Sequence, residues 1–349
     1  MKLKKINSLQ IYRGIAAVLV VLFHATTYSQ EKLNRPFLNN IFLFGYTGVD
    51  FFFVLSGFII FYAHAQDIST YQPVTPYLTK RLIRIYPIYW FVTLTKLVIL
   101  LCVPTLAKSY EKQISVILAS VLLIPQANLP IIGAAWTLSY ELFFYLLFGL
   151  AIWLGGRWGF YLLGAWSLIL LCFAVGEVIG IRGLPEHYLV KFLLNERNLE
   201  FILGCISAYC VVRRRLAYPC LMALSGGILF LAAGLYVSYG GQVPSYTVFF
   251  GIPSLLLITG SASLELQSQV RLARPLIFLG DASYSIYLTQ GMVINVVALL
   301  LFRLNQLTQL NLSLSVAIIA CLTILGGSAV YQFVERPLLS LIRTRRMAQ

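Results

Sequence analysis

Long apolar runs, separated by short polar breaks, recur along almost the whole chain. A run of about 20 apolar residues is long enough to cross the hydrocarbon core of a bilayer as a helix. The chain therefore reads as all-α, and hydropathy predicts helices at residues 9–28, 41–64, 82–103, 114–124, 137–154, 159–180, 199–212, 220–239, 246–263, 281–302 and 312–334.

The segment ISVILASVLLI, at residues 114–124, is too short to cross at about 1.5 Å per residue against a core of about 30 Å. If it does not cross, most Lys and Arg residues, including those at 213–215, lie on the side of the N-terminus. The positive-inside rule favours this arrangement, with about ten transmembrane helices and both termini cytoplasmic. Residues 114–136 are then expected to enter the outer half of the membrane and wall a site.

Composition agrees with this pattern. Of the 349 residues, 59% are hydrophobic and 11% are charged, whereas about a quarter of a soluble domain is charged. The sequence predicts a polytopic membrane protein with a single transmembrane domain over residues 1–349. The net charge of +14 is explained by basic residues at the cytoplasmic helix ends, so nucleic acid is not an expected partner. The six cysteines form no CxxC pair, and no metal site is predicted.

The first predicted helix carries Arg13 and His24 inside its apolar run. Ionisable groups at membrane depth are costly unless they are paired or face a wet cavity. Helical geometry places both on one face, about 16 Å apart along the axis. This spacing suits a ligand that enters from one side, leaves its anion near Arg13 and reaches His24. The alternative is that neighbouring helices satisfy both side chains.

Two carboxylates follow within apolar helices. Asp50 lies in GVDFFFVLSGF and Glu141 in AWTLSYELFFYLLF. In the ten-crossing topology both are expected in the outer third of the membrane, at the depth of His24. A carboxylate beside an imidazole fixes its tautomer and raises its basicity, so an acid/base cluster is predicted. A purely structural ion pair is the alternative for Asp50.

A basic pair stands at the cytoplasmic entry of the third predicted helix. In LTKRLIRIYPIYW, Arg81 and Arg84 are three residues apart and share a face. Guanidinium groups bind phosphate bidentately, so the pair favours an anionic ligand from the cytosol. Any cytoplasmic helix end collects basic residues, so the pair alone is weak support. The prediction is a two-level site with an anion grip inside and an acid/base cluster outside.

The segments YRGIAAVLVVLFHA, GVDFFFVLSGF, RLIRIYP and AWTLSYE, in this order, resemble the signature of the membrane-bound acyltransferase-3 family. LEFILG and LGDASYSIYLT are most similar to exopolysaccharide-type O-acetyltransferases. The resemblance spans nearly the whole chain. It implies an enzyme of the bacterial cytoplasmic (inner) membrane that moves an acetyl group from cytosolic acetyl-CoA to a hydroxyl of a cell-surface polysaccharide or its lipid-linked precursor.

The resemblance also implies roles for single residues. Arg13 and His24 match the family's first-helix pair, Asp50 its GVD acid and Glu141 the acid that closes its W-T-L-x-x-E. His24, Asp50 and Glu141 are the implied catalytic residues. His24 would act as general base on the acceptor hydroxyl or would carry the acetyl group transiently.

Arg81 and Arg84 match the family's RxxR, so the resemblance implies that they bind acetyl-CoA, with Arg13 assisting. One position departs from the pattern, because Gln290 stands where many relatives have histidine. Gln290 is therefore not counted as catalytic. Glu200 begins a predicted helix, where an acid suits the helix dipole.

Other assignments stay open at this stage. Ser56 or Ser139 could act as nucleophile, although neither lies in a GxSxG elbow and a packing role is favoured. A transporter or a flippase of a lipid-linked glycan would also hold charges at mid-membrane, but it would act without acyl-CoA. A non-catalytic scaffold would leave the buried ionisable residues without a purpose. The oligomeric state is not indicated.

Overall fold

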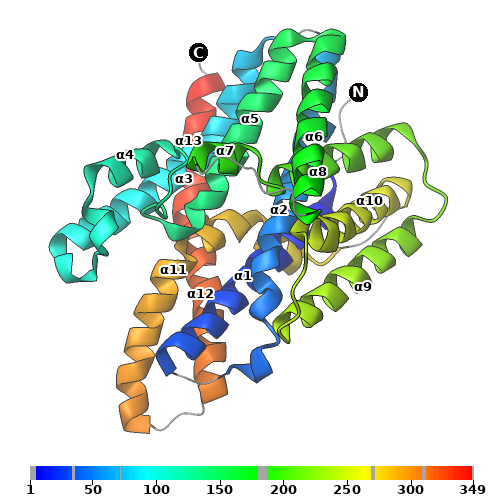
Figure 1. The fold of residues 1–349 in the computed structure, drawn as a ribbon. Coiled ribbons are helices and arrows are strands. Elements are labelled where there is room, and N and C mark those ends of the chain that lie inside the picture. The colour runs from blue at the N-terminus through cyan, green and yellow to red at the C-terminus, as the bar shows by residue number, and fades with distance from the viewer. Residues whose placement is uncertain are drawn as a thin grey trace. The chain divides into compact units, whose positions relative to one another are not determined.

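The fold was analysed in a computed structural model, which describes residues 5–33, 36–70, 72–179, 187–268, 272–308 and 312–347 (Figure 1). These residues form helices and connecting segments, so the predicted all-α class is confirmed. The longer helices are α1 (Asn7–Leu33), α2 (Gly48–Ser69), α3 (Val74–Cys102), α5 (Trp136–Leu154), α6 (Gly156–Val178), α8 (Arg197–Arg213), α9 (Pro219–Ser238), α10 (Ile252–Gln267), α11 (Arg274–Thr308), α12 (Leu312–Val330) and α13 (Arg336–Met347).

Shorter elements join these helices. Two π-helical turns extend longer helices, since η6 leads directly into α10 and η7 joins α12 to α13. The shorter elements are η1 (Leu38–Asn40), η2 (Leu43–Thr47), η3 (Pro104–Leu106), η4 (Ser109–Lys112), α4 (Ile114–Leu122), η5 (Gly133–Ala135), α7 (Tyr188–Leu193), η6 (Thr247–Gly251) and η7 (Tyr331–Glu335).

Within the described chain, nine helical segments are long and apolar enough to cross a membrane. They are Asn7–Glu31, Leu43–Ser69, Val74–Cys102, Gly133–Leu154, Gly156–Gly176, Pro219–Ser238, Thr247–Gln267, Arg274–Leu301 and Ser313–Ile342. Ten spans were predicted, and the tenth, at residues 199–212, corresponds to α8. This helix has 17 residues and is not one of the nine segments. The short segment after α3 forms α4, which has nine residues and cannot span a core of about 30 Å as a helix. The protein is a multi-pass membrane protein, and the cytoplasmic location of both termini stays a prediction.

The chain divides into two compact units. The first unit contains the described parts of residues 1–9, 49–82 and 139–273, and the second contains those of 10–48, 83–138 and 274–349. Helix α3 contributes its first part to the first unit and the rest to the second. The prediction of a single domain over the whole chain stays a prediction.

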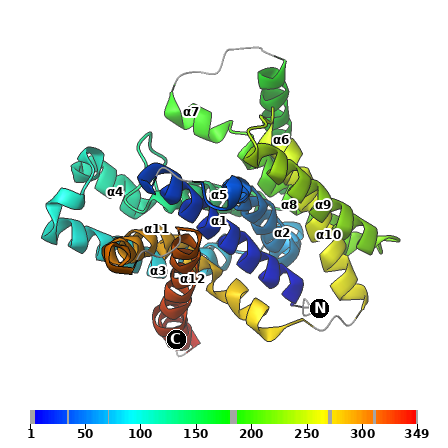
Figure 2. The same cartoon turned by 90° about the horizontal axis from the view of Figure 1, so that it is seen from below.

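Helix contacts in the first unit depend on glycine. A Cβ on Gly57 of α2 would lie 1.9 Å from the carbonyl oxygen of Phe201 on α8. A Cβ on Gly204 of α8 would lie 2.0 Å from the carbonyl oxygen of Val54. The two backbones therefore touch, which is how small residues hold membrane helices together. Helices α9 and α10 also run side by side in both views (Figures 1 and 2).

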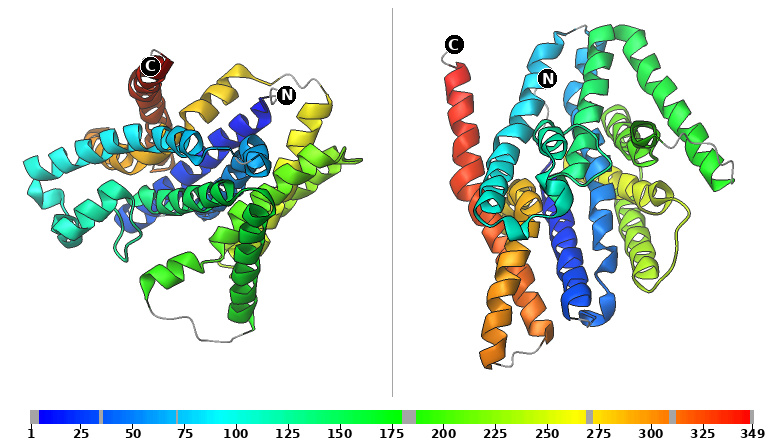
Figure 3. Two further views of the ribbon diagram at one scale, coloured as in Figure 1. Left: turned by 90° about the horizontal axis from the view of Figure 1, so that it is seen from above. Right: turned by 60° about the vertical axis from the view of Figure 1, so that its left-hand side comes forward.

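The second unit uses the same device. A Cβ on Gly280 of α11 would lie 1.8 Å from the carbonyl oxygen of Gln10 on α1, so these two backbones are in contact. A Cβ on Gly327 of α12 would lie 2.5 Å from the Cα of Ile286 on α11. Figure 3 shows the later part of α11 beside α12. Close contacts of this kind fix the side chains of α1 and α11 against one another.

Polar contacts hold α4 in the second unit. Tyr89 on α3 donates a hydrogen bond to the carbonyl of Ser120 at 2.6 Å, and Trp90 donates to the carbonyl of Val121 at 3.0 Å. Tyr86 donates to the next carbonyl, that of Leu122, at 3.0 Å. The last carbonyls of a helix have no partner inside the helix. Side chains of α3 therefore complete the C-terminus of α4.

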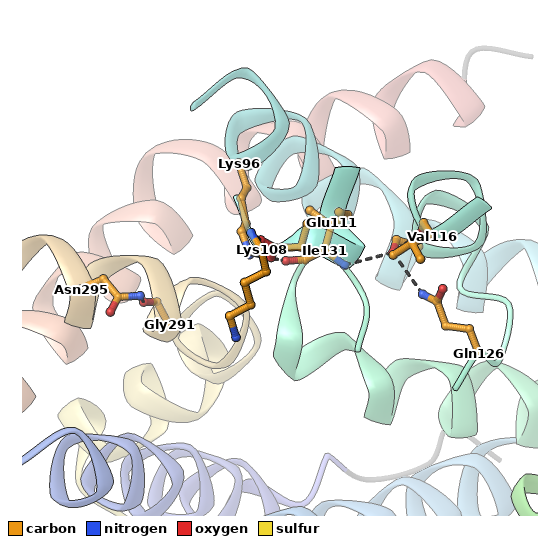
Figure 4. A network of polar contacts seen from close by, with 9 residues as sticks. Lys96, Lys108, Glu111, Val116, Gln126, Ile131, Gly291 and Asn295 are labelled. Carbon is orange, nitrogen blue, oxygen red and sulfur yellow. Dashed lines mark hydrogen bonds and ion pairs between the residues drawn. The ribbon is translucent and has the colours of Figure 1, made fainter. Parts of the chain in front are cut away.

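Lys96 contacts the chain both before and after α4, at Glu111 and at Ile131 (Figure 4). The Lys96 ammonium group is 2.8 Å from Oε1 of the buried Glu111, and it also donates to the carbonyl of Ile131. The Ile131 N–H donates to the Ser120 hydroxyl at 2.9 Å. A non-spanning segment is tolerated at membrane depth only where protein satisfies its backbone. The contacts of α4 meet this requirement, and its predicted depth in the membrane stays a prediction.

Candidate functional site

Helix α1 carries the predicted pair Arg13 and His24 in the second unit. The His24 ring contacts the ring of Phe23, with 5.0 Å between centroids, and its side chain is partly exposed. Within the described residues, neither imidazole nitrogen makes a hydrogen bond or ion pair. The Arg13 guanidinium donates to the Gln10 side chain at 3.2 Å. His24 thus retains both nitrogen atoms for a ligand.

Asp50 lies in the first turn of α2 and is fully buried. Its Oδ1 accepts a hydrogen bond from Nε of Arg197 at 3.1 Å, and Arg197 begins α8. The close approach of α2 and α8 at their glycines places this pair opposite one another. A pairing of His24 with Asp50 stays a prediction, since His24 belongs to the second unit and Asp50 to the first.

Arg197 is the functional candidate that the sequence reasoning missed. Its guanidinium lies over the ring of Tyr246, 5.4 Å from the centroid, and close to the buried carboxylate of Glu200. Arg197 thus lies beside two buried acidic side chains, of which Asp50 forms an ion pair with it. One signal was available, because a cation in the first turn of a helix opposes the helix dipole and needs an acidic partner. Glu200, read from the sequence as a helix-dipole acid, belongs to this buried cluster.

Glu141 lies on α5, also in the first unit, and is partly exposed. Its Oε1 accepts a short hydrogen bond from the Tyr145 hydroxyl, one helical turn further along. The same oxygen accepts a weaker bond from the Ser56 hydroxyl of α2 at 3.4 Å. Oε2 makes no hydrogen bond within the described chain. Glu141 is thus fixed through one oxygen and retains the other for a ligand.

Arg81 lies near the same group. Its guanidinium carbon is 5.8 Å from the ring centroid of Tyr77 and 5.8 Å from that of Tyr145. Its Nε is buried without a hydrogen bond, as is the Tyr77 hydroxyl. Among the described residues Arg81 forms no ion pair with a carboxylate. The first unit therefore holds a cation without an anionic partner, one tyrosine ring away from Glu141.

Arg84, three residues further along α3, has different partners in the second unit. Its guanidinium is 2.7 Å from Oε1 of Glu335, which is fully buried in η7. Oε2 of Glu335 accepts a hydrogen bond from the Ser285 hydroxyl of α11 at 2.6 Å. The Tyr284 ring lies 5.4 Å from the Arg84 guanidinium carbon. The two arginines of RLIR thus differ, since Arg84 already has a carboxylate partner.

Gln290 lies on α11 and is 1% exposed. Within the described chain, neither its amide oxygen nor its amide nitrogen makes a hydrogen bond. An unpaired buried amide costs about 1–3 kcal/mol. This position therefore places an unsatisfied polar group inside the second unit.

The two units offer different functional groups to a ligand. The first unit offers Arg81 for an anion and Glu141 as a carboxylate with one free oxygen. The second unit offers His24 as a base, because its ring nitrogens make no hydrogen bond or ion pair among the described residues. Each unit thus holds an ionisable group that is ready for a ligand, while Asp50, Arg84 and Glu335 are engaged in ion pairs.

Comparison with known proteins gives two matches. The sequence profile of a protein family, described as an acyltransferase domain of the acyltransferase-3 type, matches residues 6–332. The chain is also similar to the exopolysaccharide production protein ExoZ of Rhizobium meliloti (strain 1021), with 29% identity over 338 residues, 94% of this chain and 97% of that protein. No solved structure matches the chain.

Proposed function

Because the chain belongs to the acyltransferase-3 family of membrane proteins, we propose that it is an O-acetyltransferase that uses cytosolic acetyl-CoA. The acceptor is a hydroxyl group of a cell-surface polysaccharide or of its lipid-linked precursor. The name of the relative, an exopolysaccharide production protein, supports a polysaccharide acceptor. The protein then works in the cytoplasmic membrane of a bacterium.

The proposal that acetyl-CoA is the acyl donor is supported by one structural observation. Arg81 has no carboxylate partner in the described chain, and a single ring, that of Tyr145, separates it from Glu141. An unpaired guanidinium favours a phosphate group as its ligand. Arg81 is therefore the main contact for the phosphates of acetyl-CoA. Arg84 contributes less than the sequence alone suggests, because Glu335 already neutralises it.

His24 acts as general base in the proposed reaction. Its imidazole takes the proton of the acceptor hydroxyl as the hydroxyl oxygen attacks the acetyl carbonyl carbon. The new ester C–O bond forms, the thioester C–S bond breaks, and the proton passes to the CoA thiolate. In the second route, a His24 ring nitrogen attacks the thioester carbonyl carbon, and the C–S bond breaks to leave the CoA thiolate. The acceptor oxygen then attacks the acetyl carbon, the N–C bond breaks, and the hydroxyl proton passes to the thiolate. Glu141 orients the acceptor through its free carboxylate oxygen, and Asp50 holds α2 against α8 through Arg197.

The test is the release of free thiol from acetyl-CoA by purified protein in nanodiscs. We expect turnover by the wild type, and a loss of about a hundredfold or more in His24→Ala with unchanged CoA affinity. We expect Arg81→Ala to weaken CoA binding at least tenfold, because it removes a charge-assisted phosphate contact. Arg157→Ala, an exposed arginine stacked on Trp158, is the matched control and should behave as the wild type.

The outcome separates acyl transfer from transport. If the wild type neither binds CoA nor releases it, the donor assignment is wrong, and movement of a lipid-linked glycan across the membrane becomes the better explanation. If His24→Ala turns over as fast as the wild type, the general-base role is wrong. Acetylation of a polysaccharide fraction, followed with labelled acetyl-CoA, then identifies the acceptor.

A further inference from the structure

A cavity of about 240 Å³ lies in the first unit, where α8 and α10 both end. None of the predicted site residues lines it. Its walls come from two short stretches of chain, residues 211–215 and 263–267, which include Arg213, Arg214, Arg215 and Ser263. The cavity is thus formed by residues to which the proposed acetyl transfer gives no role.

Positive charge dominates this cavity. Arg213, Arg214 and Arg215 are consecutive and exposed. Arg213 lies over the ring of Tyr209, 6.0 Å from its centroid. Arg214 and Arg215 form no ion pair with any described carboxylate. Glu265, the one acidic residue of α10, does not line the cavity and accepts hydrogen bonds from the backbone N–H groups of Asn7 and Ser8, both at 2.7 Å.

A buried hydroxyl in the wall has no partner among the described residues. Ser263 is 3% exposed, and its hydroxyl oxygen makes no hydrogen bond with that part of the chain. On the same helix, or directly after it, Ser254, Thr259 and Ser268 each donate to the carbonyl four residues earlier. Ser263 could do the same but does not. A buried hydroxyl without a partner costs free energy, so this one is available to a ligand that accepts a hydrogen bond.

We propose that this cavity binds a phosphate group, with the Arg214 and Arg215 guanidinium groups as counter-charges and the Ser263 hydroxyl as a donor. Guanidinium groups pair with phosphate oxygens through charge-assisted hydrogen bonds. Hydroxyl donors add direction to such contacts. Neither cation has a competing carboxylate among the residues that the structure describes, which distinguishes this cavity from the surroundings of Arg84.

The volume of the cavity and its predicted side of the membrane limit which molecules can supply the phosphate group. Sites for whole small molecules occupy about 300–1,000 Å³, so the cavity suits a phosphate-bearing group rather than a complete nucleotide. In the predicted topology residues 213–215 face the cytoplasm, where anionic lipid headgroups attract basic residues beside helix ends. The phosphate belongs either to an anionic lipid or to one end of a soluble phosphorylated molecule such as CoA.

The experiment compares the two sources on the full-length protein. Native mass spectrometry measures retention of phosphatidylglycerol against phosphatidylcholine, and titration measures affinity for CoA and for dephospho-CoA, which lacks the 3′-phosphate. The variants are Arg214→Gln/Arg215→Gln and Ser263→Ala. Arg157→Gln is the control, because residue 157 is also exposed and is predicted to lie on the cytoplasmic side.

We expect one bound phosphatidylglycerol per wild-type chain, a loss of roughly tenfold or more in the double arginine variant, a smaller loss in Ser263→Ala, and none in Arg157→Gln. If instead CoA affinity falls in these variants while dephospho-CoA affinity does not, the phosphate is that of the soluble donor. If all variants match Arg157→Gln in both assays, the proposal is wrong. The lipid measurement does not involve CoA, so its outcome is independent of the test of acetyl transfer, which follows CoA binding and turnover.

Discussion

At the scale of single residues, the arginines of RLIR differ in what lies opposite them. Arg81 is held between tyrosine rings without a carboxylate, whereas Arg84 faces the fully buried Glu335. Spacing on α3 makes the two look equivalent. Because their partners differ, Arg81 is the better candidate for binding a ligand, and we expect Arg84 to contribute to stability.

The Arg84–Glu335 pair gives a stability prediction. Removing one partner of a buried pair leaves the other charge uncompensated. We expect Glu335→Gln to lower the free energy of unfolding by about 1–3 kcal/mol, less than for a fully buried pair, because 29% of the Arg84 side chain is exposed. Thermal unfolding in detergent, followed by tryptophan fluorescence, measures this change.

The double variant Arg84→Met/Glu335→Met is the control for that measurement. It removes both charges and leaves none unpaired, so it should be more stable than Glu335→Gln. Equal loss of stability in the single and double variants would contradict the role of the ion pair.

At the scale of elements, two glycines bring α2 and α8 into backbone contact. A Cβ on Gly204 would overlap the Val54 carbonyl oxygen at 2.0 Å, and backbone cannot move aside as a flexible side chain can. This contact lies between the same two helices that carry Asp50 and Arg197. The position of the Asp50–Arg197 pair thus depends on a residue that has no functional group.

We therefore expect Gly204→Ala to lower the midpoint of thermal unfolding by forcing α2 and α8 apart, at a cost of about 1–3 kcal/mol. Gly164→Ala on α6 is the matched control, because nothing lies within 4 Å of the added Cβ. It should be neutral or stabilising by up to about 1 kcal/mol, since alanine favours a helix over glycine. Similar midpoints for the two variants would exclude the steric explanation.

The short helix α4 gives a second prediction at this scale. Tyr89 is fully buried and completes the C-terminus of α4 through the Ser120 carbonyl. We expect Tyr89→Phe to cost about 1–2 kcal/mol and to speed hydrogen exchange in residues 114–136. Tyr86→Phe removes a bond from a more exposed position and should have a smaller effect. Unchanged exchange in Tyr89→Phe would show that this bond does not hold α4.

At the scale of the whole molecule, the open question is the direction of the chain after α4. If α4 does not cross, Lys112 lies outside and Arg214 lies inside; if it crosses, every later helix is inverted. In an otherwise cysteine-free protein in intact cells, we expect a membrane-impermeant thiol reagent to label Lys112→Cys and to leave Arg214→Cys unlabelled. Labelling of both would show that α4 spans the membrane.

The sequence by itself determined the helical class, the approximate bounds of the long helices and the family. Apolar runs must be buried in lipid, and a helix satisfies its own backbone there, so local composition is enough to predict each element. The apolar segment at residues 114–124 was likewise predictable as too short to span, and α4 takes up nine of its residues.

Only the tertiary structure decided which ionisable residues have partners. Asp50 pairs with Arg197 of a distant helix and Arg84 pairs with Glu335, whereas Arg81 contacts tyrosine rings and no carboxylate in the described part of the chain. These pairings depend on which helix faces approach one another, and contacts such as that of Gly57 with Phe201 set that approach. The sequence shows how far apart two residues lie along one helix. Their charged partners come from other helices, so the spacing alone does not identify them.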